Sequence, residues 1–283
     1  MTTVVWVDGE VGDERTATVP AVDHGLTVGD GVFETCHVAA GEAFAVTRHL
    51  RRLGRSATAI GLTPPADDAV HAAVAEVLAA ARGRGADLAN GRLRITLTGG
   101  PGPLGSNRGP AGSTLVVAYA PAPPWPADPT AVTVPWTRNE RSAIAGVKST
   151  SYAENVVALA AAAQRGAQEA IFANTRGELC EGTGTNVVVV ADGVLLTPPV
   201  TSGCLAGITR ELLLEWAADG GLPLVEKDLP IEVLGEADDV LLTSSTRGVQ
   251  PQAAVDGRPL PRGELARAAQ ELYMRRAATG LDP

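Results

Sequence analysis

The stretch Gly146-Val147-Lys148-Ser149-Thr150-Ser151-Tyr152-Ala153-Glu154-Asn155 joins an extended apolar segment to the start of an alanine-rich helix. Its one lysine, Lys148, is of a residue type that is ordinarily a solvated surface charge. Three polar stretches follow it: Glu181-Gly182-Thr183-Gly184-Thr185-Asn186, Gly207-Ile208-Thr209 and Thr243-Ser244-Ser245-Thr246. A chemical role for Lys148 therefore depends on what these companions can do.

The composition is that of an ordinary globular protein with an acidic balance. The 283 residues are 45% hydrophobic and 19% charged, and the net charge is −9. This charge argues against a nucleic-acid or anionic-membrane partner. Cys36, Cys180 and Cys204 are odd in number and scattered, which indicates reduced thiols and no zinc site. No signal peptide or membrane-spanning run is evident, so we expect a cytoplasmic protein.

The first half of the chain mixes β patterns with two helical patterns. We expect strands over residues 3–7, 16–19, 32–38, 92–98 and 113–119. The strand over 32–38 is expected to return in a hairpin through Phe44-Ala45-Val46. Thr47 is expected to cap the first helix, and a second helix is expected over 67–81.

Residues 121–129 are rich in proline, which cannot hold a helix or a central strand. We expect a linker there, between a smaller domain over 1–120 and a larger one over 130–283. The second half predicts helices over 152–164, 208–218 and 262–277 among several short strands. Neither half shows regular βαβ alternation, so the predicted fold class is α+β.

Three elements of the sequence are suited to binding a phosphate. Gly207 precedes an apolar helix, whose first N–H groups and positive dipole end attract anions. The hydroxyl-rich residues 243–246 follow a predicted strand, and Arg52 lies on the first helix. Each element alone has an ordinary structural explanation, but three in one chain favour a bound phosphate.

Glu181 and Tyr152 suggest what else a ligand would carry. Glu181 precedes a buried strand, where a carboxylate is costly without a cationic partner. A protonated pyridine nitrogen would be such a partner. Tyr152 lies four residues after Lys148, about one helical turn, where a phenol could reach a ring oxygen.

Together these residues resemble one family, the fold-type IV pyridoxal-phosphate enzymes. This family includes branched-chain and D-amino acid aminotransferases, (R)-amine transaminases and 4-amino-4-deoxychorismate lyase. Six landmarks occur in the family's order over nearly the whole chain: residues 23–34, 49–53, 146–148, 181–186, 205–210 and 243–246. The resemblance implies a two-domain architecture like that of D-amino acid aminotransferase, with pyridoxal 5'-phosphate between the domains. It also implies a homodimer.

The resemblance also implies a role for each matching residue. Lys148 would form a Schiff base with the cofactor and then move the substrate's proton. Glu181 would hold the pyridine nitrogen, Tyr152 the ring hydroxyl, and Leu205 would pack on the ring. The phosphate would be bound by Arg52, by the helix start at Gly207, Ile208 and Thr209, and by Ser245 or Thr246.

The strand over residues 92–100 departs from the family pattern. Thr98 stands where lyases and D-amino acid transaminases usually place an arginine before the loop glycine. Arg94 or Arg108 could bind the substrate carboxylate instead, since a guanidinium suits a carboxylate. Phe33 is expected to line the pocket. A loosened carboxylate site fits a transaminase that takes an amino group from D-amino acids or (R)-amines and gives it to a 2-keto acid.

Two other functions stay open at this point. The spacing from Lys148 to Glu181 fits the lyase, which releases pyruvate and 4-aminobenzoate, whereas the retained Tyr152 is typical of transaminases. A protein that binds pyridoxal phosphate without turnover belongs to a different class. Lys148 argues against it, because a binding protein needs no lysine to move a proton.

Overall fold

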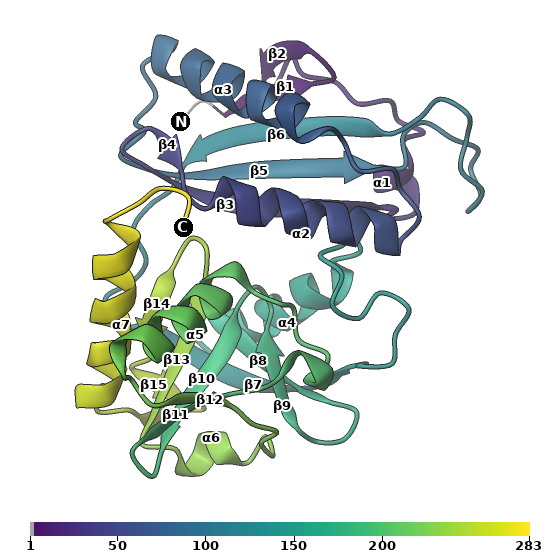
Figure 1. Cartoon of the computed structure of the whole chain (residues 1–283). Coiled ribbons are helices and arrows are strands. Elements are labelled where there is room, and N and C mark those ends of the chain that lie inside the picture. Colours follow the sequence, from purple (N-terminus) through teal and green to yellow (C-terminus); the bar gives the residue numbers. More distant parts are fainter. Residues whose placement is uncertain (1–2) are drawn as a thin grey trace. The chain divides into compact units, whose positions relative to one another are not determined.

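The computed structural model describes residues 3–283. The chain divides into two compact units (Figure 1). Unit 1 comprises the chain up to Pro124 together with Val147–Tyr152 and Leu281–Pro283, and unit 2 comprises Trp125–Gly146 and Ala153–Gly280. The segment that carries Lys148 thus belongs to unit 1, although its neighbours along the chain on both sides belong to unit 2.

Unit 1 is built on a six-stranded antiparallel sheet in the order β2-β1-β6-β5-β3-β4. The strands are β1 (Val4–Val7), β2 (Glu10–Asp13), β3 (Gly31–Ala39), β4 (Glu42–Ala43), β5 (Asn90–Thr98) and β6 (Thr114–Pro121). Its helices are α1 (His24–Thr27), α2 (Val46–Ala59) and α3 (Asp67–Gly83). Helix α2 lies along β3, and α3 lies along β1 and β6 (Figure 1).

Alternation along the strands separates the two faces of this sheet. Leu93, Ile95 and Leu97 of β5 are buried against the helices, within one core that also holds residues of α2 and α3. The intervening residues, among them Arg94 and Thr96, face the other side. Because β3 pairs with β5 at Phe33↔Thr96, Phe33 shares this second face.

Two local predictions for unit 1 were wrong. Strand β2 covers Glu10–Asp13, and residues 16–19 form no strand, because the Asp8-Gly9 turn brings residues 10–13 directly back along β1. The return strand after β3 is only Glu42–Ala43, and α2 begins at Val46. Ala45, in a left-handed conformation, is the N-cap, whereas Thr47 hydrogen-bonds to Asp282.

Unit 2 contains a ten-stranded mixed sheet with the path β12-β11-β10-β9-β8-β7-β15-β16, and with β13 and β14 joined through β10. Its strands are β7 (Thr130–Arg138), β8 (Glu169–Asn174), β9 (Leu179–Gly182), β10 (Asn186–Ala191), β11 (Val194–Thr197), β12 (Leu224–Glu226), β13 (Asp239–Ser244), β14 (Gly248–Pro251), β15 (Ala254–Val255) and β16 (Arg258–Pro259). Its helices are α4 (Ala153–Gln164), α5 (Ile208–Gly220), α6 (Val233–Glu236) and α7 (Glu264–Ala277), and a single 3₁₀ turn covers Val200–Ser202.

Helices cover the strands of unit 2. Helix α4 lies on β7 and β8, while α5 and α7 pack on each other and on β13 (Figure 1). Both units mix helices with mainly antiparallel strands, so the predicted α+β class is confirmed. The three cysteines are free and buried. Within residues 3–283, no helix combines the length and apolar character needed to cross a bilayer.

Candidate active site

The backbone of Lys148 is fixed within unit 1. Its carbonyl accepts a hydrogen bond from Phe33 N at 2.9 Å, and the nearby Thr150 N donates to Gly31 O at 2.8 Å. Lys148 N donates to Ser56 Oγ on α2 at 3.4 Å. The lysine segment is therefore paired with β3 as a short extended piece.

Three of the predicted site residues contact Phe33, which lies on the face of the sheet that does not pack against α2 and α3. Lys148 Nζ lies 4.5 Å from the centre of its ring, and Arg94 Cζ lies 3.6 Å from it. The Tyr152 ring meets it edge to face, with the ring centres 5.3 Å apart. An amine, a guanidinium and a phenol are thus held around one aromatic ring.

The reason given above for placing Tyr152 near Lys148 was wrong. Residues 148–152 belong to no helix, since α4 begins only at Ala153, so the two residues are not one helical turn apart. Pairing of Ser149 with Val32 keeps this segment along β3. Tyr152 and Lys148 are nevertheless close, because both contact the ring of Phe33.

Arg52 is held beneath the sheet by Glu34 of β3. Its Nε and Nη2 donate to the two carboxylate oxygens of Glu34, each at 2.7 Å, and His49 Nδ1 lies 2.6 Å from Glu34 Oε2. Burial favours the neutral form of Glu34, but the charge of Arg52 and hydrogen bonds from Arg52 and His49 lower its pKa to about 2. Burial lowers the pKa of His49, against the raising effect of Glu34. The sequence indicated Arg52 but missed Glu34 as its partner.

Thr98 and Arg108 belong to a different part of unit 1, the base of the loop between β5 and β6. Thr98 Oγ1 donates to the buried Asp23 at 2.9 Å. Arg108 makes two hydrogen bonds to Asp30 (2.7 and 2.6 Å) and one each to the carbonyls of Ile60 and Gly61. These bonds anchor the loop. Arg108 is thus committed to Asp30 and to the carbonyls of Ile60 and Gly61.

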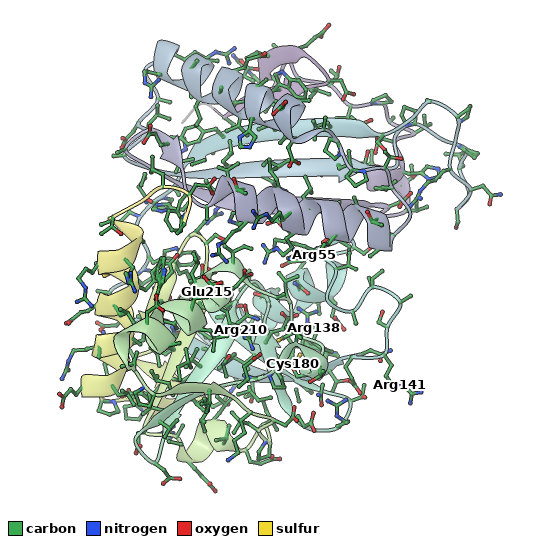
Figure 2. All side chains as sticks on the ribbon, in the orientation of Figure 1. Arg55, Arg138, Arg141, Cys180, Arg210 and Glu215 are labelled. Carbon is green, nitrogen blue, oxygen red and sulfur yellow. The ribbon has the colours of Figure 1, made fainter. Side chains whose placement is uncertain are left out.

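Glu181 has a cationic partner within unit 2. Its Oε1 lies 3.1 Å from Arg138 Nε, and its Oε2 accepts a hydrogen bond from Leu205 N at 2.8 Å. Arg138, which Figure 2 labels, ends β7. It also binds Glu154, and its Cζ lies 4.1 Å from the centre of the Phe172 ring. Glu181 therefore does not require a cationic ligand, because Arg138 already offsets its charge within the protein. Arg138 was missed because an arginine at a strand end is usually solvated.

Asn186 brings the other predicted residues of unit 2 together. It pairs with Glu181 on β9 and with Thr243 on β13. Its Nδ2 donates to Leu205 O at 2.8 Å, and a side chain at Gly207 would begin only 1.9 Å from its Oδ1. Glycine at position 207 is therefore required by close approach. The sequence could not show this convergence.

The N-cap residue of helix α5 has no side chain that could bind the first N–H groups of the helix. Gly207 is its N-cap in an extended conformation and provides no side-chain hydrogen bond. Thr209 is buried and hydrogen-bonds to Tyr273. Burial raises the pKa of Tyr273, and the hydrogen bond with Thr209 lowers it in part. Ser245 and Thr246 form the turn between β13 and β14. A helix start and a hydroxyl turn in one unit suit an anion such as phosphate.

Known proteins resemble this chain along nearly all of its length. The family model described as amino-transferase class IV matches residues 31–255. A putative branched-chain-amino-acid aminotransferase of Methanocaldococcus jannaschii is 32% identical over 277 residues, which cover 95% of this chain and 94% of the relative. A D-alanine aminotransferase of Staphylococcus epidermidis is 30% identical over 276 residues, with 95% of each chain covered.

A solved structure agrees with these sequence relatives. The branched-chain aminotransferase from Thermoproteus uzoniensis, described with norvaline, has a TM-score of 0.90 and 31% sequence identity. The match covers 99% of this chain and 96% of that one. Since the relatives include proteins named for branched-chain amino acids and for D-alanine, their names leave the preferred donor open. Among residues 3–283, no group of three or more His, Cys, Asp or Glu could hold a metal ion.

Proposed function

Because the chain belongs to the class IV aminotransferases, we propose that it transfers an amino group from D-amino acids or (R)-amines to a 2-keto acid, with Lys148 as the catalytic base. The observation that carries this proposal is the cluster of Lys148, Arg94 and Tyr152 around Phe33. Such a cluster offers a base and a group that can bind a carboxylate, on one face of one sheet.

The residues fit pyridoxal phosphate, the cofactor of this family. Unit 1 carries the Lys148 amine and the buried Arg52, and unit 2 carries the Glu181 carboxylate and the helix start at Gly207. We propose that Arg52, Ile208, Thr209, Ser245 and Thr246 bind the cofactor's phosphate. When bound, pyridoxal phosphate supplies an aldehyde for the amino group and a ring that withdraws electrons.

The chain's own residues then orient the substrate and move its proton. With the cofactor bound, Lys148 Nζ would take the proton from the substrate's α carbon and deliver it to the cofactor carbon that carries the aldehyde. Glu181, oriented by Leu205 N and Arg138, would hold the ring nitrogen of the cofactor with its negative charge. Tyr152 would hydrogen-bond to the ring oxygen, and Leu205 would pack on the ring.

Arg94 is the candidate that we propose for the keto acid's carboxylate. Within the described residues it has no carboxylate partner, and its Nε makes only a 3.3 Å bond to Thr96. Burial lowers the pKa of Arg94, although an arginine remains charged at neutral pH. Arg108, in contrast, is already bound to Asp30. A site with Arg94 as its one carboxylate-binding arginine suits donors that have no carboxylate, such as (R)-amines.

We also propose a homodimer. Helix α4 exposes Val156, Val157 and Leu159, apolar side chains of the kind that a partner subunit covers. Sedimentation at micromolar protein concentration should give twice the mass of the 28.9 kDa chain. A monomer at that concentration would contradict this part of the proposal.

A panel of donors tests the reaction. Each L-amino acid, D-amino acid or (R)-1-arylethylamine is added without a keto acid to the protein loaded with pyridoxal phosphate. We expect D-amino acids and (R)-amines to consume the visible absorption of the bound cofactor faster than L-amino acids do. Aminodeoxychorismate is the control for the lyase, and rapid pyruvate release from it with no response to any amine would overturn the proposal.

A further inference from the structure

Trp125 contacts the turn that carries Ser245 and Thr246. Its Nε1 donates to Thr246 O at 2.9 Å, and its ring centre lies 3.9 Å from Arg247 Cζ. Trp125 stands in the proline-rich stretch, which the sequence marked only as a linker. One side chain of that stretch thus holds two consecutive residues of the turn between β13 and β14.

Arg247 continues the contact into the interior of unit 2. Its Nη2 donates to Glu169 Oε2 at 2.9 Å, and the side chains are 7% and 1% exposed. The other oxygen of Glu169 accepts hydrogen bonds from the backbone N, at 3.0 Å, and from the Oγ1 of Thr183. A buried ion pair of this kind is costly to break on one side, and it holds its partners in one arrangement.

Thr183 lies two residues after Glu181, in the turn that leads to Asn186. Asn155 of α4 donates to its carbonyl, so the turn is held from two directions. The contacts form one continuous path from Trp125 through Arg247 and Glu169 to Thr183. The path joins the turn at 245–246 to the turn at 181–186, and all of it lies in unit 2.

We propose that Trp125, Arg247 and Glu169 are positioning residues that fix the phosphate-binding turn relative to the carboxylate beside the ring nitrogen. This rests on the proposed function, which assigns Ser245, Thr246 and Glu181 to the cofactor. An arginine is suited to the central place because its planar group can stack on an indole and bind a carboxylate at once. A lysine would lose the stacking.

The test compares pyridoxal phosphate with pyridoxal, which lacks the phosphate. Trp125→Phe keeps an aromatic ring but removes the donor to Thr246 O. Its dissociation constant for pyridoxal phosphate should rise about tenfold, which is about 1.4 kcal/mol. That for pyridoxal should stay within about twofold. A general loss of packing would weaken both ligands alike, so the ratio of the two constants separates positioning from stability.

A double-mutant cycle tests the path itself. Thr183→Val removes the hydroxyl donor to Glu169, and the two substitutions should be non-additive for pyridoxal phosphate by about threefold or more. Arg247→Lys and Glu169→Gln alter the buried ion pair itself. If either variant fails to fold, Trp125→Phe and Thr183→Val still test the path. Trp6→Phe and Arg176→Lys are matched controls. The first removes the hydrogen bond from the indole of Trp6, on β1, to Glu76 on α3, and the second alters the surface pair with Glu178. Both should leave the ratio unchanged.

The outcomes distinguish this inference from the function beneath it. A wild-type protein that binds neither ligand overturns the proposed function and the inference together. A wild-type protein that binds both, with Trp125→Phe leaving their ratio within twofold, overturns the inference alone. Effects of Trp125→Phe and Thr183→Val that simply multiply would show that the two turns are not coupled, and would overturn it as well.

Discussion

Removing the charge of Glu34 should destabilise unit 1 and change how its stability depends on pH. Glu34→Gln keeps the shape of the side chain but leaves the buried Arg52 without its carboxylate. The pKa of Glu34 lies at about 2 against an ordinary value of 4.5. At roughly 1.4 kcal/mol per pKa unit, its ionised form gains about 3 kcal/mol from the fold. Removing one partner of a buried ion pair costs about 3 to 5 kcal/mol, and the value from the pKa of Glu34 falls in this range.

The sign of the pH effect follows from the lowered pKa. The unfolded chain takes up a proton at Glu34 near pH 4.5 and the folded chain only near pH 2, so the stabilisation is full above 4.5. It is lost as the pH falls from 4.5 towards 2. The lowered pKa of His49 acts in the same direction, since acidification below about 6.5 protonates the unfolded chain first.

The assay is equilibrium unfolding in urea at several pH values between 7 and 3.5. Glu34→Gln should lose about 3 kcal/mol at pH 7 and lose less of its remaining stability on acidification than the wild type does. Asp219→Asn, which breaks the exposed pair with Arg276, is the control and should change stability by less than about 1 kcal/mol. Because the chain has two units, only the transition that shifts with Glu34→Gln is compared. A loss below about 1 kcal/mol at pH 7, or an unchanged pH slope, would refute the reasoning.

Three further predictions concern the site and the loop between β5 and β6. Glu181→Gln should lower kcat by about a hundredfold, because a negative charge is lost beside the ring nitrogen. Steady-state rates at saturating pyridoxal phosphate measure this effect, and a decrease in kcat below about threefold would count against the role assigned to Glu181. Arg94→Met should raise KM for the keto acid by about tenfold or more with a smaller change in kcat, and an unaltered KM would exclude Arg94 as the carboxylate partner. Arg108→Lys should speed limited proteolysis of residues 99–113 several-fold, since the paired bonds to Asp30 are lost. Arg55→Lys, at an exposed position, is the control. Equal digestion of the two variants would show that Arg108 does not anchor the loop.

Some of this molecule could be predicted from the sequence because the signals are local. The helix over 67–81 and the strand over 92–98 follow from apolar periodicity, and both occur with slightly longer bounds. The cap of α2 could not be predicted, because Ala45 takes a left-handed conformation whose backbone N–H binds the distant Leu281. Threonine propensity at position 47 was overridden by that long-range contact.

The candidate site shows the same limit. Motifs indicated Lys148, Glu181 and the start of α5, but they did not indicate the contacts that these residues make in the fold. Arg138 and Asn186 around Glu181, and Glu34 beneath Arg52, are brought in by strand register and packing. Chain order alone also places Lys148 with the second half, whereas backbone bonds to β3 group its segment with unit 1.

Lys148 is the residue that we propose as the base of the amino-group transfer. The most direct measurement follows the visible absorption of bound pyridoxal phosphate in a stopped-flow instrument after D-alanine or (R)-1-phenylethylamine is added to wild type and to Lys148→Ala. We expect rapid loss of the band with at least one donor in the wild type. In Lys148→Ala, which still binds the cofactor's phosphate, the rate should be lower by at least about a hundredfold. A Lys148→Ala protein that converts the cofactor at the wild-type rate, or a wild type that no donor converts, would contradict it.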